Sequence, residues 1–546
     1  MVLSVFGAIL EIAGISVLLH TILSILKTDF IQHNILTSLV YEKLQIENNQ
    51  QFILVMSIIL LIVYILKNIT LVYINKKQVR IAFEMSDYMS EKHFEDVSKK
   101  SLLYFVSKKS AEIINELYST SVTLAEAVII PSILLGSELA VIALLLVAVL
   151  VYQPILFLFT VSLMLPGAYL LIRYNRKKLM ERGAEINSII PKVHENINEL
   201  TYGIANVKLW DGEAYFFKRY TKYKKRSNAI KETIYISANY IPLRMYEVIA
   251  IAGILTVVIF GVITQQYQEA VASYITIYAG ISFRLLPSIN RVIASSNNIS
   301  TFSYILRFFN TGNQYSEDVP QGEKIAFEQL ELRNAHFSYP NGKIIFDHLN
   351  FKISKGEFIG ILGESGSGKS TLVQLVTSLI PPTQGELWVN GAPLKAAQTG
   401  AFRYLFSYVK QDVFMLNSSI RKNVAFLEEN PDEQKIEKCL KQVNLWDWVQ
   451  QLDKNWDTNV GELGNQISGG QRQRIAIARA LYKEAEIFVF DEVTNNLDTY
   501  SKEQTLQAIN LLKKAGKTAV FITHKPEELS ICDNVYEVKD KKIEAY

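Results

Sequence analysis

The chain has 546 residues, of which 49% are hydrophobic and 20% are charged, and its formal net charge is +3. This length indicates two or more domains, and the small net charge argues against a nucleic-acid binder, which usually carries a basic stripe. The two cysteines, Cys439 and Cys532, have neither metal-ligand nor redox spacing, so no disulfide or metal site is expected from them. Long apolar runs fill residues 1–310, residues 311–325 read as a linker, and residues 326–546 have the mixed charge of a soluble α/β domain.

Six segments of the first domain are apolar and long enough to cross a bilayer, which takes about 20 residues of helix. They lie at 2–26, 52–74, 122–151, 154–175, 236–263 and 269–292. A signal peptide is an alternative for the first segment, but that segment has no Lys or Arg before Lys27 and runs too long for a leader. The pattern therefore predicts an all-α transmembrane domain of six helices.

The connections between these segments alternate in charge. Residues 76–109 carry eight Lys or Arg and residues 173–231 carry fourteen, whereas 152–153 and 264–268 carry none. Because basic loops stay on the cytoplasmic side of a membrane, we expect both long connections and the C-terminal domain to be cytoplasmic. Both basic connections also have a helical pattern, which predicts helices that continue well beyond the membrane.

Ionisable residues within the expected spans are costly in lipid, so they are candidates for a transport pathway or for ion pairs between helices. Both interpretations stay open for each of Glu11, Glu126, Glu138, Arg244, Glu247 and Arg284. A guanidinium donates two parallel hydrogen bonds to phosphate oxygens, so Arg284 and Arg244 are the candidates for contact with an anionic headgroup. In the last span, Pro287 is expected to break or kink the helix.

The soluble half contains a phosphate-binding loop of the form G-x-x-x-x-G-K-S at residues 363–370. An apolar strand is expected before it at 358–362, and a helix is expected to begin near Lys369. Glycines let backbone N–H groups face a β-phosphate, Lys369 adds a positive charge, and Ser370 offers a hydroxyl to Mg²⁺. The nucleotide-binding residues expected here are Gly363, Glu364, Ser365, Gly366, Ser367, Gly368, Lys369, Ser370 and Thr371.

A second apolar strand is expected at 487–490, and it places Asp491 and Glu492 at its carboxyl end, where ligands of α/β sheets bind. Asp491 suits the Mg²⁺ shell, and Glu492 suits the base that orients and deprotonates an attacking water. A third strand at 518–522 leads to His524, which can contact a γ-phosphate and hold Glu492 in place.

Other residues complete this predicted site. The strand at 407–411 ends in Gln411, whose side-chain oxygen can join the Mg²⁺ and water network, and residues 412–485 read as an inserted, largely helical subdomain. Tyr339 follows a strand and is placed to stack on adenine, although an ordinary edge-strand tyrosine is the alternative. Asp498 lies in a turn after the catalytic strand, where it can reach across an interface or only cap the turn.

A second anion site is expected where Ile467 precedes Ser468, Gly469, Gly470 and Gln471 at the start of a helix. The first backbone N–H groups of a helix are unpaired and lie at the positive end of its dipole, so they attract an anion.

Taken in this order, the motifs make the chain resemble an ABC transporter of the exporter class, with the membrane domain first and the ATPase second. The resemblance identifies residues 363–370 as Walker A, Gln411 as the Q-loop, 467–471 as the signature, Asp491 and Glu492 as the end of Walker B, 495–498 as the D-loop and His524 as the switch histidine, with Tyr339 as the aromatic loop. The signature usually starts with leucine and the D-loop with Ser-Ala, which here are Ile467 and Asn495-Asn496. The first span starts almost at Met1, without the interfacial helix that usually precedes it.

The resemblance implies ATP and Mg²⁺ as cofactors and a dimer, because each ATP lies between the Walker A loop of one subunit and the signature of the other. A homodimer would have two competent sites, and a heterodimer is the alternative. The segment 282–291 is similar to that of flippases for lipid-linked oligosaccharides, which implies an exporter of a lipid or lipid-linked glycan in the bacterial inner membrane. The alternatives are an exporter of peptides or hydrophobic drugs, and an ATP-gated channel or regulator. No nucleic-acid partner is expected.

Overall fold

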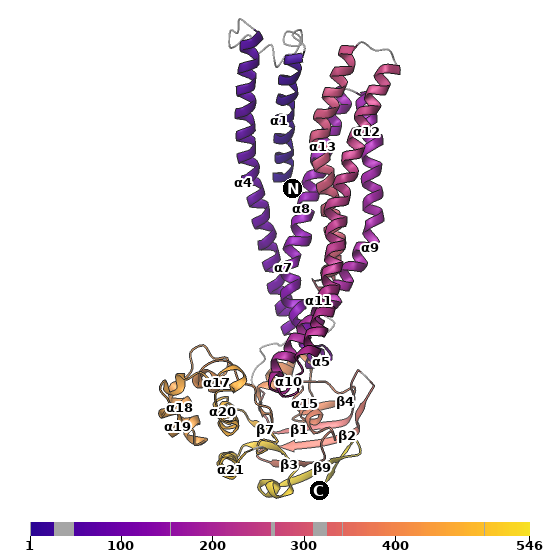
Figure 1. The fold of residues 1–546 in the computed structure, drawn as a ribbon. Coiled ribbons are helices and arrows are strands. Elements are labelled where there is room, and N and C mark those ends of the chain that lie inside the picture. The colour runs from indigo at the N-terminus through magenta and orange to yellow at the C-terminus, as the bar shows by residue number, and fades with distance from the viewer. Residues whose placement is uncertain are drawn as a thin grey trace. The chain divides into compact units, whose positions relative to one another are not determined.

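The computed structural model describes residues 2–26, 49–152, 154–263, 268–309, 325–340, 342–495 and 497–546. The chain forms two compact units (Figure 1). Unit 1 comprises Met1–Ser98 and Lys108–Gln314, and unit 2 comprises Lys99–Ser107 and Tyr315–Tyr546. The linker predicted at 311–325 falls almost wholly outside the described residues and stays a prediction. The segment Lys99–Ser107 lies within the first domain predicted from the sequence, but in the structure it belongs to unit 2. Its residues Leu102 and Leu103 pack against the core of that unit.

Unit 1 is helical throughout its described residues. Its elements are α1 (Val2–Leu26), α4 (Asn49–Ser98), α6 (Ser110–Ile114), η1 (Asn115–Ser119), α7 (Thr120–Leu124), η2 (Ala125–Ile129), α8 (Ile130–Tyr152), α9 (Pro154–Tyr202), α10 (Ile204–Leu209), α11 (Glu213–Tyr235), η3 (Ile236–Tyr240), α12 (Ile241–Ile263), α13 (Gln268–Phe302), η4 (Ser303–Ile305) and α14 (Leu306–Phe309). The described residues of all six predicted spans lie in these helices, and α4, α9 and α13 continue past them. Of the break or kink predicted at Pro287, the break does not occur, since α13 continues through this residue. Packed neighbouring helices tolerate a proline that would end an isolated helix.

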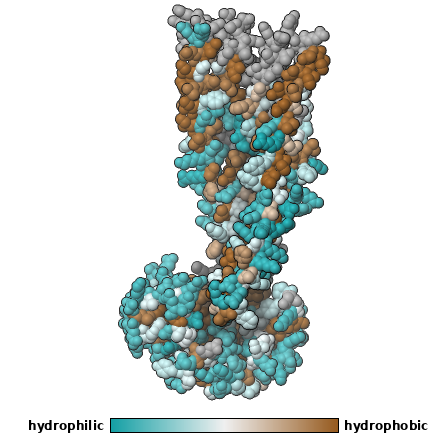
Figure 2. Space-filling model, in the orientation of Figure 1, coloured by the Kyte–Doolittle hydropathy of each residue, from teal (hydrophilic) through white to brown (hydrophobic). Residues whose placement is uncertain are grey.

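Apolar side chains face outward on the helices of unit 1, and Figure 2 shows this hydrophobic surface in brown. Helix α12 exposes a stripe of five residues at helical spacing, each 55–72% exposed: Val248, Ile251, Leu255, Ile259 and Val262. Among the described residues, Gln50–Ser98 and Ser110–Val151 are each long and apolar enough to cross a membrane, and only 11% and 28% of their most apolar windows are buried. A helix that exposes its apolar face in this way is not the core helix of a soluble protein.

Unit 2 contains two sheets. The antiparallel sheet has the order β2-β1-β4-β5, and the larger sheet has the order β10-β9-β3-β8-β7-β6, parallel from β9 to β6. The strands are β1 (Gln329–Ser338), β2 (Ile344–Ser354), β3 (Phe358–Leu362), β4 (Gln384–Val389), β5 (Ala392–Pro393), β6 (Phe406–Val409), β7 (Ile487–Asp491), β8 (Thr518–Ile522), β9 (Asn534–Lys539) and β10 (Lys542–Ala545).

The helices of unit 2 are α5 (Leu102–Ser107), α15 (Lys369–Val376), α16 (Thr399–Tyr404), α17 (Ile420–Val424), α18 (Glu433–Gln442), α19 (Trp446–Gln450), α20 (Gly469–Tyr482) and α21 (Thr499–Lys514), with short 3₁₀ segments at Ala396–Gln398, Asn455–Asp457, Glu462–Gly464 and Pro526–Ile531. The segment between β6 and β7 is mainly helical, as the sequence predicted. Side chains of β3 alternate between two cores: Phe358 and Leu362 join the one that includes α17 to α20, and Ile359 and Ile361 join the other. The parallel sheet is therefore buried on both faces.

Candidate functional site

The phosphate loop joins the fully buried strand β3 to helix α15 at the carboxyl edge of the sheet. Gly366 and Gly368 have φ values of +82° and +113°, which side chains rarely adopt. A Cβ atom at Gly368 would also lie 2.8 Å from Ile345 Cγ2. The hydroxyl of Ser367 is buried and makes no hydrogen bond within the protein. The loop therefore has the tight backbone of an anion cradle, with a buried polar atom that a bound phosphate would satisfy.

Lys369 is buried, and its Nζ donates hydrogen bonds to the carbonyl oxygens of Gly363, at 2.7 Å, and Glu364, at 2.9 Å. The same Nζ lies 4.0 Å from Glu492 Oε1. The ammonium is thus held inside its own loop by neutral acceptors, close to the carboxylate predicted to act as the base. Phosphate oxygens are charged acceptors, which bind an ammonium more strongly than carbonyl groups do.

Four adjacent strands bring the predicted catalytic residues to one edge of the sheet. β3 leads to the phosphate loop, β8 to Thr523 and His524, and β7 ends at Asp491. Gln411 lies exposed, two residues after the end of β6. The carboxyl edge of a parallel sheet is where ligands bind in α/β folds, so the order β3-β8-β7-β6 places all these groups around one position.

Glu492 has a φ of +51°, a left-handed conformation that is unusual for a glutamate. Its backbone N–H donates to Ile522 O at 2.9 Å, and Asn495 Nδ2 donates to its Oε2 at 2.6 Å. His524 Nδ1 lies 3.9 Å from Oε1. The bond to Ile522 holds the backbone of Glu492, and the Asn495 amide holds its carboxylate. A left-handed backbone at a residue other than glycine is characteristic of functional sites. Asn495 belongs to the predicted D-loop, while Asn496 lies outside the described residues.

Asp491 is held by a residue that sequence reasoning did not assign to the site. The Tyr408 hydroxyl on β6 donates to Asp491 Oδ2 at 2.8 Å. Burial raises the pKa of Asp491, and the hydrogen bond from Tyr408 opposes that shift. The sequence motif that ends in Gln411 contains Tyr408, but only the structure shows that Tyr408 on β6 pairs with Val489 on β7, two residues before Asp491.

The remaining nucleotide residues lie around the same loop. The Tyr339 hydroxyl is 3.2 Å from Thr371 Oγ1, so the predicted adenine-stacking residue is tied to the helix that follows the phosphate loop. Ser370 is exposed in the first turn of that helix. With Asp491 and Gln411 it supplies the hydroxyl, carboxylate and amide oxygens that Mg²⁺ accepts as ligands. The residues present therefore fit MgATP.

The second predicted anion site opens helix α20. Ser468 caps this helix by accepting from Gln471 N at 3.2 Å, and Gln471 Oε1 accepts from Ser468 N at 2.8 Å. Gly470 packs closely on α21, since a Cβ there would lie 2.8 Å from Ser501 Oγ. Asp498 is exposed and caps α21 by accepting from Ser501 N at 2.9 Å. Among the described residues, no hydrogen bond or ion pair joins this site to the phosphate loop.

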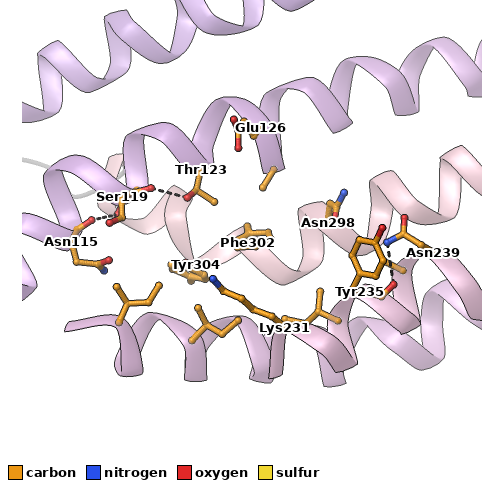
Figure 3. A pocket seen from close by; sticks show the side chains of 16 residues that line it. Asn115, Ser119, Thr123, Glu126, Lys231, Tyr235, Asn239, Asn298, Phe302 and Tyr304 are labelled. Carbon is orange, nitrogen blue, oxygen red and sulfur yellow. Dashed lines mark hydrogen bonds between the residues drawn. The ribbon is translucent and has the colours of Figure 1, made fainter. Parts of the chain in front are cut away.

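The ionisable residues of the predicted spans fall into three groups. Glu11 of α1, Glu138 of α8 and Arg284 of α13 form a largely buried ion-pair cluster, in which Arg284 contacts Glu11 and lies 3.6 Å from Glu138. Arg291 Nε also lies 2.6 Å from Glu138 Oε1. Arg244 and Glu247 form an exposed pair one turn apart on α12, at 2.9 Å. Glu126 makes no ion pair with a described residue and lines a cavity (Figure 3).

Comparison with known proteins agrees with this geometry. Residues 346–495 match the family model described as ABC transporter. Residues 346–495 therefore carry an ABC transporter domain. A curated relative, the ATP-dependent lipid A-core flippase of Saccharophagus degradans, is 30% identical over 388 residues, covering 69% of this chain and 63% of the relative. The heterocyst differentiation ATP-binding protein HepA of Nostoc is 25% identical over 487 residues, covering 86% of this chain and 77% of HepA.

The whole chain also has the fold of an ABC exporter. A solved structure of a bacterial Atm1-family ABC exporter with ATP bound superposes with a TM-score of 0.81, covering 99% of this chain and 94% of that chain at 18% sequence identity. The matches to lipid A-core flippases span 63–65% of those relatives' length. The likeness at 18% identity shows the fold, with a helical membrane-type domain followed by the ABC ATPase domain.

Proposed function

We propose that the chain binds and hydrolyses MgATP at the carboxyl edge of its parallel sheet. The observation that carries this proposal is the convergence of Lys369, Asp491, Glu492 and His524 around the phosphate loop. Glu492 is the general base in this proposal, because its carboxylate is held beside Lys369 and its second oxygen is fixed by Asn495. His524 positions the base and contacts the γ-phosphate.

Mg²⁺ would be held by Ser370, Gln411 and Asp491, and when bound it neutralises negative charge on the phosphates. Lys369 exchanges the carbonyl groups of its loop for phosphate oxygens and orients them. Burial raises the pKa of Asp491, and the hydrogen bond from the Tyr408 hydroxyl opposes that shift, which favours the carboxylate form that a metal ion needs as a ligand.

We further propose that two chains associate so that the Ser468, Gly469, Gly470 and Gln471 end of one meets the phosphate loop of the other. Two observations support this. The N-terminus of α20 is capped by Ser468 and carries two glycines, and no hydrogen bond or ion pair among the described residues joins it to the phosphate loop. Asp498 lies exposed beside it and can contribute across the same interface. A homodimer would form two equivalent sites.

The transported molecule in this proposal is an amphipathic lipid, specifically a lipid-linked glycan. Support comes from the outward apolar stripe of α12 and from the relatives named as lipid A-core flippases. The proposed location is the bacterial inner membrane, with the nucleotide domain in the cytoplasm, because the long basic connections favour that side. Transport is driven by the ATP hydrolysis proposed above.

The proposed hydrolysis is tested by Glu492→Gln, with the exposed Glu503→Gln as a matched control. Removing a general base should lower ATP turnover by about 10²-fold or more while MgATP still binds. The control should hydrolyse ATP at the wild-type rate. Near-normal turnover in Glu492→Gln would refute the assignment of the base.

The shared site is tested by combining two variants in one dimer. Lys369→Ala should weaken nucleotide binding at its own phosphate loop, and Ser468→Arg should block the partner's γ-phosphate position. In a mixed dimer one subunit carries Lys369→Ala and the other carries Ser468→Arg. If the sites are shared, both substitutions fall in the same composite site, so the second composite site stays intact and the dimer should keep part of the activity. Complete loss in the mixed dimer, equal to either variant alone, would contradict the shared geometry.

Transport is tested in liposomes that contain a labelled polyprenyl-diphosphate glycan, whose loss from one leaflet is followed with MgATP. Wild type should move the lipid and Glu492→Gln should not. If the protein moves a hydrophobic cationic dye or a peptide under the same conditions but does not move the glycan lipid, the glycan proposal is wrong and the transported molecule belongs to that other class.

A further inference from the structure

Three unusual helical segments meet at one cavity in unit 1. The segments η1, η2 and η3 are π-helical, and they are the π-helical segments found in the described residues. π-Helical turns are rare and occur frequently at functional sites. Each of them contributes side chains to the wall of a single cavity of about 410 Å³. Their convergence on one place is difficult to attribute to separate packing accidents.

Side chains of the same region support the widened turns. Thr120 Oγ1 donates to Asn115 O at 2.9 Å, Thr123 Oγ1 donates to Ser119 O at 2.7 Å, and Asn239 Nδ2 donates to Tyr235 O at 3.0 Å. These bonds, drawn in Figure 3, satisfy carbonyl groups on the turns that border the cavity. The cavity wall is therefore stabilised by the protein itself, and other polar atoms stay available to a ligand.

Several polar atoms of the wall have no hydrogen-bond or ion-pair partner among the described residues. Asn115 is 5% exposed, and its Oδ1 is buried without a hydrogen bond. Glu126 and Lys231 make no ion pair with a described residue, and the amide of Asn298 makes no hydrogen bond with one. Figure 3 shows these side chains around the cavity, together with the aromatic side chains of Phe302 and Tyr304. Polar groups converging in a partly apolar cavity are the usual composition of a ligand site.

The chemistry of this wall favours a hydroxyl-rich ligand over an anion. Lys231 is its one cation among the described residues, and Glu126 offsets that charge. An anionic diphosphate would gain little here, because recognition of phosphate needs an excess of positive charge. Amides and hydroxyls both donate and accept, as the hydroxyls of a sugar require, and the rings of Phe302 and Tyr304 offer apolar faces to a sugar ring.

The cavity also lies where an amphipathic molecule would place its headgroup. η2 lies in the first turns of the predicted span 122–151, and η3 begins the predicted span 236–263. Asn115 and Lys231 belong to the helical extensions outside these spans. We propose that this cavity binds the sugar headgroup of the transported lipid at the cytoplasmic end of the membrane. This inference rests on the proposed function, because it assigns a binding site to the lipid-linked glycan.

The test uses the full chain in nanodiscs, without nucleotide, and a polyprenyl-diphosphate disaccharide that carries a photoreactive group on the sugar. Cross-links should concentrate in peptides 231–239 and 298–304, and the same lipid without the disaccharide should compete poorly for them. Asn298→Leu, which nearly preserves volume, should weaken labelling by about tenfold, the effect of one or two lost hydrogen bonds. Asn228→Leu, at an exposed position of α11 outside the cavity, should label as wild type does.

A second variant keeps the result interpretable. Ala127→Phe fills the cavity from η2, and it should abolish labelling while the basal ATPase rate shows that the protein remains folded. Labelling that is unchanged in both variants, or equal competition by the lipid without sugar, would overturn the headgroup site. Binding without ATP-dependent transport would instead retain the site and refute the proposed transport, so the two failures are distinguishable.

Discussion

Glu528 is a buried carboxylate that joins three segments behind the catalytic edge, and its removal should have a local and measurable cost. The residue is 3% exposed. Its Oε2 accepts hydrogen bonds from Thr494, at 2.7 Å, and from Thr523, at 2.8 Å, while Lys502 Nζ lies 2.6 Å from Oε1. Thr523 directly precedes His524, and Lys502 lies in the first turn of α21. The carboxylate therefore links the segment that leads to His524 to helix α21, which Asp498 caps.

The expected loss for Glu528→Ala follows from these contacts. Thr494 and Thr523 are buried, and a buried hydroxyl that loses its partner costs about 1–3 kcal/mol. Breaking a buried ion pair by removing one member costs about 3–5 kcal/mol. Because the Lys502 side chain is 28% exposed and can turn toward water, most of the ion-pair cost is relieved. We therefore expect a total of about 3 kcal/mol, mainly from the two hydroxyls. Glu527 is exposed, so Glu527→Ala is the matched control.

Native-state hydrogen exchange on the full chain measures this cost as a local opening free energy. Amides of 494–502 and 523–529 should lose about 3 kcal/mol of protection in Glu528→Ala, with the distant strand β1 unaffected. If these amides are as protected in Glu528→Ala as in Glu527→Ala, the reasoning is refuted, because the Glu528 carboxylate then does not stabilise the two segments.

The same network predicts a pH dependence. Burial opposes ionisation of Glu528, but Lys502 and the two threonines outweigh it and hold its pKa below the usual range. A lowered folded-state pKa contributes stability above the unfolded value of about 4.3, and this stability is lost as the pH falls through the folded value. Glu528→Gln should therefore flatten the acid dependence of protection in these segments, and an unchanged slope would contradict the assignment.

Three further outcomes follow. Tyr408→Phe removes a hydrogen-bond donor to Asp491 and should raise the pKa of Asp491, so the acid limb of the ATPase pH profile should shift to higher pH by about one unit. The exposed Tyr404→Phe is the control, and an acid limb that stays in place in Tyr408→Phe would contradict the prediction. Lys369→Ala should weaken nucleotide binding by about tenfold or more in equilibrium titration, and wild-type affinity would refute its role. Arg284→Ala leaves the Glu11 carboxylate without its ion-pair partner and should lower thermal stability by about 3 kcal/mol or more. Stability equal to that of Arg244→Ala, together with reduced stimulation of the ATPase by substrate, would instead favour a headgroup contact.

The local features of unit 2 were accessible to sequence because they depend on short patterns. The strands expected at 358–362 and 518–522 have those bounds in the structure, and the helix expected near Lys369 begins there. Glycine spacing and apolar runs specify such elements before any tertiary contact forms. The predicted linker at 311–325 and the residue roles in the site stay predictions.

Contacts between distant segments were not accessible in the same way. Glu527 and Glu528 are adjacent and chemically identical, yet only Glu528 is buried, because the turn that follows His524 faces it toward Thr494. The π-helical segments escape a search based on a period of 3.6 residues, since an inserted residue shifts the register only where neighbouring helices permit it. Pro287 shows the same limit, because the packing around α13 tolerates a residue that would end an isolated helix.

The distribution of charge in unit 1 separates structural ion pairs from ligand chemistry. Arg284 and Arg291 are matched by Glu11 and Glu138, so this cluster is neutral, and its members already have partners. A phosphate that entered it would have to displace a carboxylate from each guanidinium, which leaves a buried negative charge uncompensated. The cavity bordered by η1, η2 and η3 carries no such cost, because neither Glu126 nor Lys231 in its wall makes an ion pair with a described residue. A headgroup that enters the cavity displaces water and breaks no ion pair among the described residues, which is why we place the ligand there and assign Arg284 to the helix bundle.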